Sequence, residues 1–188
     1  FLTQIPVDYK PAAKCPNIET LIGNVFMPDQ IDAEYEWIGY CLTPGNRYKV
    51  FSFYNGATDS GRSTYFNLIE EMIGAKNRAA IEPQDLAKEF YLYELHDAMI
   101  DICADVGSHK ITNFNVIKKL TGGDPMPANI KNKPIITFRN NCKLMWAANK
   151  MPPFDDNTSA AYNRLRQIDC LKVIDKAEIK DFNFADYT

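Results

Sequence analysis

Short apolar runs of strand length alternate along this chain with longer segments of helical periodicity. The strand candidates are β-branched, aromatic or aliphatic runs at 48–54, 98–105, 135–138 and 144–148. Apolar residues recur with a period near 3.6 in the segments 17–26, 28–42, 66–73, 83–95 and 113–120. Strands that alternate with helices predict an α/β fold with a mainly parallel sheet. We expect residues 1–45 to form a small helical segment ahead of a core domain at 46–188.

The segment 55–66, NGATDSGRSTYF, joins the first strand candidate to a helix. Gly56, Gly61 and Ser63 have the spacing of the phosphate-binding loop G-x-x-x-x-G-K-[ST], with Arg62 in the place of lysine. Such a loop turns backbone N–H groups around phosphate oxygens, and the helix N-terminus adds partial positive charge. Ser63 has the position of a Mg²⁺ ligand, and Arg62 that of a contact to the terminal phosphates. The loop alone is equally consistent with a glycine-rich turn that binds nothing.

Polar residues follow two other strand candidates. Asp105 ends the run 98–105, where a nucleoside triphosphatase needs an acid that positions Mg²⁺. Asp101 precedes it by four residues and is expected on the same face of the strand. Asn149 follows the run 144–148, where a side-chain amide orients the attacking water. Taken singly, the three have plainer interpretations as a helix cap, a paired buried acid and a turn residue.

The charge of the chain is unevenly distributed, although its net value is only −3. The stretch 110–150 contains eight basic residues and one acid, so it carries +7 and the rest of the chain carries −10. A concentrated basic stretch favours nucleic acid as a partner, and a solvated face is the alternative that stays open. A composition of 46% hydrophobic and 24% charged residues indicates a globular domain rather than disorder.

Other sequence features limit the possible compartments and cofactors. No apolar run reaches the roughly 18 residues of a membrane helix, and no signal peptide is recognisable. Five scattered cysteines predict free thiols in a reducing compartment, and we expect a cytoplasmic location. Neither His96 nor His109 has a partner at a metal-binding spacing. Because the chain opens on Phe1, we expect it to be a piece of a longer protein.

Together these residues resemble those of superfamily 3 helicases, in particular the phage and plasmid primase–helicases related to poxvirus-type nucleoside triphosphatases. The motifs that carry the resemblance, in chain order, are GATDSGRST, ICAD, LTGGDPMPANIKNK, KLMWAANKMPP and NRLRQID. The resemblance extends from about residue 6 to about residue 169. It implies an AAA+-like P-loop NTPase core that binds ATP and Mg²⁺. It also implies a homo-oligomeric, hexameric ring on single-stranded or forked DNA, and a primase or polymerase domain in the full-length chain.

The resemblance also assigns roles to individual residues. It implies that the Walker A loop consists of Gly56, Ala57, Thr58, Asp59, Ser60, Gly61, Arg62, Ser63 and Thr64. It assigns catalytic roles to Arg62, Asp105, Asn149 and Arg164, with Mg²⁺ held by Ser63 and Asp105 and with Arg164 reaching the γ-phosphate of a neighbouring subunit. It places the DNA-binding residues in and before a hairpin, at Lys118, Lys119, Lys131 and Lys133.

Two departures from the family pattern leave alternatives open. Arg62 keeps the positive charge of lysine, but its planar fork is larger and bonds differently. No second acid adjoins Asp105, so the general base is unassigned, and Asp101 qualifies only if its side chain faces the site. The sequence is therefore consistent with an ATP-driven ring helicase or with a hydrolysis-impaired nucleotide- and DNA-binding oligomerisation module. A small-molecule kinase is a third hypothesis, which the basic stretch disfavours.

Overall fold

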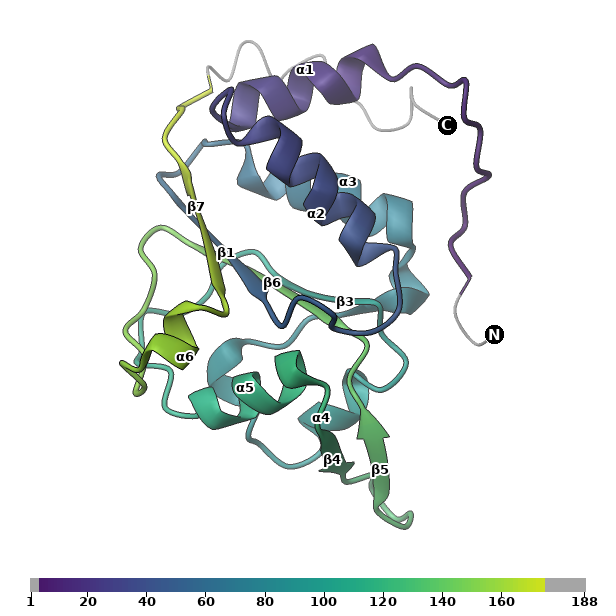
Figure 1. The fold of residues 1–188 in the computed structure, drawn as a ribbon, viewed down its shortest axis with the longest axis vertical. Coiled ribbons are helices and arrows are strands. Elements are labelled where there is room, and N and C mark those ends of the chain that lie inside the picture. Colours follow the sequence, from purple (N-terminus) through teal and green to yellow (C-terminus); the bar gives the residue numbers. More distant parts are fainter. Residues whose placement is uncertain (1–3, 175–188) are drawn as a thin grey trace.

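The computed structural model describes residues 4–174, which form a central sheet with helices on both faces (Figure 1). In chain order the elements are α1 (Pro16–Val25), α2 (Ile31–Cys41), β1 (Phe51–Gly56), α3 (Arg62–Ile73), η1 (Ala75–Asn77), β2 (Arg78–Ala79), η2 (Pro83–Asp85), α4 (Tyr91–Glu94), β3 (Ile100–Cys103), α5 (Phe114–Gly122), β4 (Pro125–Ala128), β5 (Ile136–Arg139), β6 (Lys143–Ala148), α6 (Ser159–Tyr162) and β7 (Leu165–Cys170). No helix among the described residues is long and apolar enough to cross a membrane.

The main sheet has five strands in the order β2-β3-β6-β1-β7, and every neighbouring pair is parallel. Strand β6 is buried along its whole length, as expected for a central strand of a parallel sheet. Because all five strands run in the same direction, the residues that follow β1, β3 and β6 lie on the same side of the sheet, at the carboxyl ends of the strands. The predicted α/β fold with a mainly parallel sheet is confirmed.

Two apolar clusters cover the two faces of the sheet. On one face, α1, α2 and α3 pack over Tyr54, Met145 and Ile168. On the other, α5 and the short helices pack over Phe51 and Trp146. The predicted helical segment before β1 thus shares one continuous core with the α3 face of the sheet.

A buried carboxylate ties α2 to this core. Glu34 is fully buried, and its Oε2 accepts hydrogen bonds from the hydroxyls of Tyr54 (2.8 Å) and Tyr65 (2.9 Å). Its Oε1 accepts one from Arg166 on β7, the strand at the edge of the sheet. The four side chains come from α2, β1, α3 and β7, so one charge-paired network joins elements that are distant in the sequence.

The prediction of one helix over 83–95 is wrong. The structure has a 3₁₀ turn, Pro83–Asp85, followed by turns and a single helical turn at Tyr91–Glu94. Phe90 lies between them in the left-handed region, with φ +72°, which interrupts the α-helical hydrogen bonds. Leu86 and Leu95 are both fully buried, so tertiary packing and not helical periodicity sets the spacing of these apolar residues.

The strand candidate 135–138 lies outside the main sheet. It forms β5, which pairs antiparallel with β4 in a hairpin that extends from the body of the molecule (Figure 1). The patterns did not predict β4, because Pro125 and Pro127 are atypical of a paired strand. They also did not predict β2, which has only two residues, or β7, a largely polar strand at the sheet edge.

Candidate functional site

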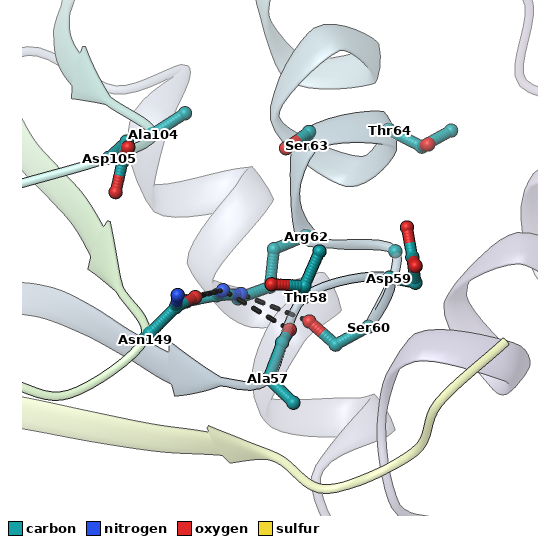
Figure 2. Close-up of a pocket in the computed structure, with 11 residues that line it drawn as sticks. Ala57, Thr58, Asp59, Ser60, Arg62, Ser63, Thr64, Ala104, Asp105 and Asn149 are labelled. Atoms are coloured by element: carbon teal, nitrogen blue, oxygen red, sulfur yellow. Dashed lines mark hydrogen bonds between the residues drawn. The ribbon is translucent and has the colours of Figure 1, made fainter.

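A cavity of about 340 Å³ opens at the edge of the sheet where β1, β3 and β6 end. It is lined by residues 57–64 of the glycine-rich loop and by Ala104, Asp105 and Asn149 (Figure 2). The loop leaves β1 at Gly56 and enters α3 at Arg62. The tertiary structure therefore brings together three segments that the sequence predicted separately.

Close packing behind the loop requires glycine at two positions. A Cβ on Gly56 would lie 2.6 Å from the carbonyl oxygen of Cys170 on β7. Gly61 has φ +79°, and a Cβ there would lie 2.5 Å from Ile174 and 2.7 Å from Val25 of α1. The backbone N–H of Ile174 also donates to the carbonyl of Asp59. The loop is thus fixed from behind by α1 and by the segment after β7, and no sequence motif indicated either contact.

The guanidinium of Arg62 is turned toward the protein and lies between Asn149 on one side and Ala57 and Ser60 on the other (Figure 2). The side chain is buried, with 9% of its surface exposed. Its acceptors are Ser60 Oγ (3.0 Å), Tyr54 O (3.2 Å), Ala148 O, Ala57 O (3.3 Å) and Asn149 Oδ1 (2.9 Å). Burial lowers the pKa of Arg62, while the Cys170 thiol and the Asp105 carboxylate oppose that shift. The group stays charged at neutral pH, because arginine starts from a very high pKa.

The oxygens that the sequence predicted as magnesium ligands lie at the same cavity. Ser63 is in the first turn of α3, and Asp105 is two residues past the end of β3. The next residue, Val106, donates its N–H to Ala147 O of β6 and so anchors the Asp105 turn against the sheet. A hydroxyl and a carboxylate, completed by phosphate oxygens and water, are a donor set that suits Mg²⁺. No group of three or more His, Cys, Asp or Glu side chains among residues 4–174 forms a metal site by itself.

Asp101 does not face the cavity, so the condition for its role as general base fails. Strand β3 ends at Cys103, and the chain bends before Asp105, so the expected alternation does not continue to that residue. Asp101 is fully buried, and its two oxygens accept from Ile81 N (2.7 Å) and Trp146 Nε1 (2.9 Å). Desolvation raises its pKa to about 7, against the opposing effect of these hydrogen bonds.

Arg164 lies at the other end of the sheet from the cavity. It directly precedes β7, and its carbonyl accepts from Phe51 N at the start of β1. The loop begins at the opposite end of β1, about 17 Å away at 3.3 Å per residue. The guanidinium of Arg164 donates to Ala160 O in α6 (2.7 Å). The structure therefore does not bring Arg164 together with the loop of its own chain.

The predicted DNA-binding lysines differ in their surroundings. Lys131 and Lys133 are exposed in the turn of the β4–β5 hairpin, and Lys119 is exposed on α5. Lys118 forms an ion pair with Asp156 (2.7 Å). Lys143, which contributed to the basic stretch, is fully buried, and its ammonium donates to three backbone carbonyls. The charge available at the surface is therefore smaller than the sequence count of +7, and the hairpin displays part of it, at Lys131, Lys133 and Arg139.

The sheet order, the loop and the cavity together define an α/β protein with a helicase-like fold and a P-loop NTPase-like core. Two apo structures of the NrS-1 C-terminal region are similar to this chain. The A form has a TM-score of 0.71 and 20% identity over 95% of this chain and 42% of that one. A second structure, of residues 305–718, has a TM-score of 0.69 and 19% identity over 95% and 43%.

A structure of JCV helicase bound to a thiazolopyridinyl phenoxyphenyl acetamide is also similar, with a TM-score of 0.52 and 18% identity over 82% of this chain and 46% of that one. At these identities the similarity shows the fold alone. The chain spans less than half of each of these solved structures. The chain belongs to the family of unknown function DUF5906, whose model matches residues 54–164. No curated protein matches it in sequence.

Proposed function

We propose that this chain is the ATP-dependent ring helicase domain of a phage or plasmid replication protein of superfamily 3. The observation that carries the proposal is the cavity at the carboxyl edge of the sheet, where the glycine-rich loop, Asp105 and Asn149 converge. Each of the three comes from a different strand–loop junction, which is the arrangement of a P-loop nucleoside triphosphatase. The helicase-like fold of the solved neighbours supports the same function.

The residues of the cavity have distinct proposed roles. Backbone N–H groups of the loop and the N-terminus of α3 hold the phosphates. Ser63 and Asp105 hold Mg²⁺, which when bound neutralises charge on the phosphate oxygens. Asn149 orients the attacking water. Arg164 acts on the nucleotide of a neighbouring subunit, a role that the helicase resemblance implies and that agrees with its distance from the loop of its own chain.

DNA is the proposed partner, and the β4–β5 hairpin is the proposed contact. Its exposed turn carries Lys131 and Lys133, which would face the channel of a ring and track a single-strand backbone. We further propose that the chain is part of a longer replication protein. Within it, residues 1–45 form the helical segment and residues 46–188 form the ATPase core, and a primase or polymerase domain belongs to the same chain.

One observation favours a second function, that of a hydrolysis-impaired nucleotide- and DNA-binding oligomerisation module. All five N–H groups of Arg62 are directed to protein oxygens, so the residue at the lysine position makes no donor available to phosphate in this arrangement. A near-zero ATPase rate that Arg62→Lys greatly increases, with DNA binding unchanged, would establish this second function.

Steady-state ATP hydrolysis, measured with and without single-stranded DNA, tests the first function. We expect a DNA-stimulated rate that Asp105→Ala abolishes, because Mg²⁺ loses its carboxylate. Glu36→Ala is the matched control, since this exposed acid on α2 lies outside the cavity and away from the hairpin, and it should retain the rate. If no rate depends on Asp105, the chain is not an ATPase.

A further inference from the structure

Every N–H group of the Arg62 side chain has an oxygen partner. A guanidinium carries five N–H donors in a planar fork, and here Nε donates once while each terminal nitrogen donates twice. The acceptors belong to three separate segments: Tyr54 of β1, Ala148 and Asn149 at the end of β6, and Ala57 and Ser60 of the loop. The side chain thus joins the loop to the ends of two neighbouring strands.

Lysine could not make the same set of contacts. Its ammonium has three donors on one atom, whereas these five oxygens are arranged around a planar fork. The arginine is also buried at 9% exposure, so turning it toward a ligand would leave several carbonyl oxygens without their donors. Unpaired buried acceptors are costly, and the inward position is therefore the stable one.

The same bonds fix the direction of the Asn149 amide. Its Oδ1 accepts from Arg62 Nη2 at 2.9 Å, so the amide nitrogen is the end left for a ligand. Within residues 4–174 the Asn149 side chain has no second hydrogen bond, and it is exposed and lines the cavity. Arg62 therefore determines that Asn149 presents N–H donors and not an acceptor.

We propose that Arg62 is a positioning residue that holds the glycine-rich loop and Asn149 in the arrangement that receives nucleotide, and that it does not itself bind phosphate. This inference rests on the proposed function for its nucleotide, but the contacts that it concerns exist without one. Where other phosphate-binding loops have a lysine that contacts phosphate, Arg62 instead makes hydrogen bonds within the protein that hold the loop. Phosphate is held by backbone N–H groups and the α3 N-terminus.

Arg62→Lys tests the inference, because it keeps the charge and removes the fork. The first measurement is the loop exchange, which is the amide hydrogen exchange of Tyr65 and Ile174 in the whole chain without nucleotide. The N–H groups of these two residues donate to the loop carbonyls of Gly61 (3.0 Å) and Asp59 (2.9 Å), so their exchange reports movement of the loop. We expect exchange to accelerate by about tenfold or more, since at least two charge-assisted hydrogen bonds are lost. Arg47→Lys is the matched control: Arg47 is an exposed arginine outside this cavity, and the same substitution there should leave the loop exchange unchanged.

The second measurement is the affinity of the same variant for ADP and for a non-hydrolysable ATP analogue, each with Mg²⁺. A positioning role predicts that both affinities fall by a similar factor, so that their ratio changes less than about twofold. An Arg62 that bound the terminal phosphate would instead change the ratio by tenfold or more.

Unchanged loop exchange in Arg62→Lys, or a variant that binds the ATP analogue more tightly than the wild type, would overturn the inference. If the wild type binds neither nucleotide while Arg62→Lys still accelerates loop exchange, Arg62 holds the loop as inferred and the proposed ATPase function fails. The two hypotheses are therefore separable in one set of samples.

Discussion

The residues packed around Asp101 determine both its hydrogen bonds and its pKa. In the sequence it shares a strand candidate with Asp105, but in the fold it bonds to the indole N–H of Trp146 and the backbone N–H of Ile81, away from the cavity. Desolvation raises its pKa to about 7, so near neutrality this carboxyl titrates inside the core. The two hydrogen bonds and the charge of Arg78 favour the carboxylate, but desolvation outweighs them, and the protonation of Asp101 is therefore coupled to folding.

We predict that this coupling makes stability depend on pH. The folded-state pKa lies above the ordinary value of 3.8, so the stability that Asp101 contributes is fully present below about pH 4 and is lost as the pH rises through about 7. The free energy of unfolding of the wild type, relative to Asp101→Asn, should fall by about 2–3 kcal/mol between pH 5 and pH 8. Urea denaturation at several pH values measures the difference, and a flat difference would contradict the prediction.

At the scale of elements, the position of α2 depends on one buried charge. Glu34 lies on the same helix as Trp37 and Tyr40, which pack in the apolar core, yet it is a charged residue at a core position. The ion pair with Arg166 and the two tyrosine hydroxyls compensate for its desolvation. The hydrophobic pattern located the helix, and the network sets which elements it is joined to.

Removing the carboxylate should loosen the helical segment from the sheet. We predict that Glu34→Ala lowers the free energy of unfolding by about 3–5 kcal/mol, because it leaves a partly buried Arg166 and two buried hydroxyls without their partner. Glu36→Ala, an exposed position on the same helix, should change it by less than about 0.5 kcal/mol. Equal effects of the two substitutions in urea denaturation would show that the network does not stabilise the fold.

At the scale of the whole molecule, the parallel sheet separates two groups of proposed site residues. Asp105 and Asn149 lie at the carboxyl ends of the strands. Arg164 directly precedes β7 and so lies at the opposite, amino ends of the strands. A complete site in the proposed ring therefore needs two subunits, one that supplies the loop and one that supplies the arginine.

Mixing two inactive variants tests this division. Asp105→Ala and Arg164→Ala should each abolish ATP hydrolysis when assayed alone. In a mixture, a subunit with Arg164→Ala keeps its own Asp105 and receives Arg164 from a neighbour with Asp105→Ala, so part of the wild-type rate should return. A mixture as inactive as either variant would place Arg164 outside a shared site. Arg166→Ala is unsuitable as the partner variant, because it would break the ion pair with the buried Glu34 and so destabilise the fold.

The sequence predicted the features that depend on local order. The alternation of strands and helices predicted the α/β class, and the glycine spacing predicted a loop between β1 and α3. Residues that follow parallel strands meet at one edge, so Asp105 and Asn149 could be expected beside that loop. The short η2–α4 region could not be predicted, because Leu86, Phe90 and Tyr93 have the i, i+4, i+7 spacing of a helix face, while the left-handed φ of Phe90 (+72°) interrupts the helix.

The sequence by itself thus determined the order of the elements, the class of fold and the residues available to the cavity, since these follow from periodicity and spacing along one chain. Only the tertiary structure decided which way the side chains at the site point. It turned Arg62 inward to five oxygens, buried Asp101 under Trp146 and left Arg164 at the far edge of the sheet. The physical reason is that hydrogen-bond partners and desolvation are supplied by residues far away in the sequence, which no local pattern records.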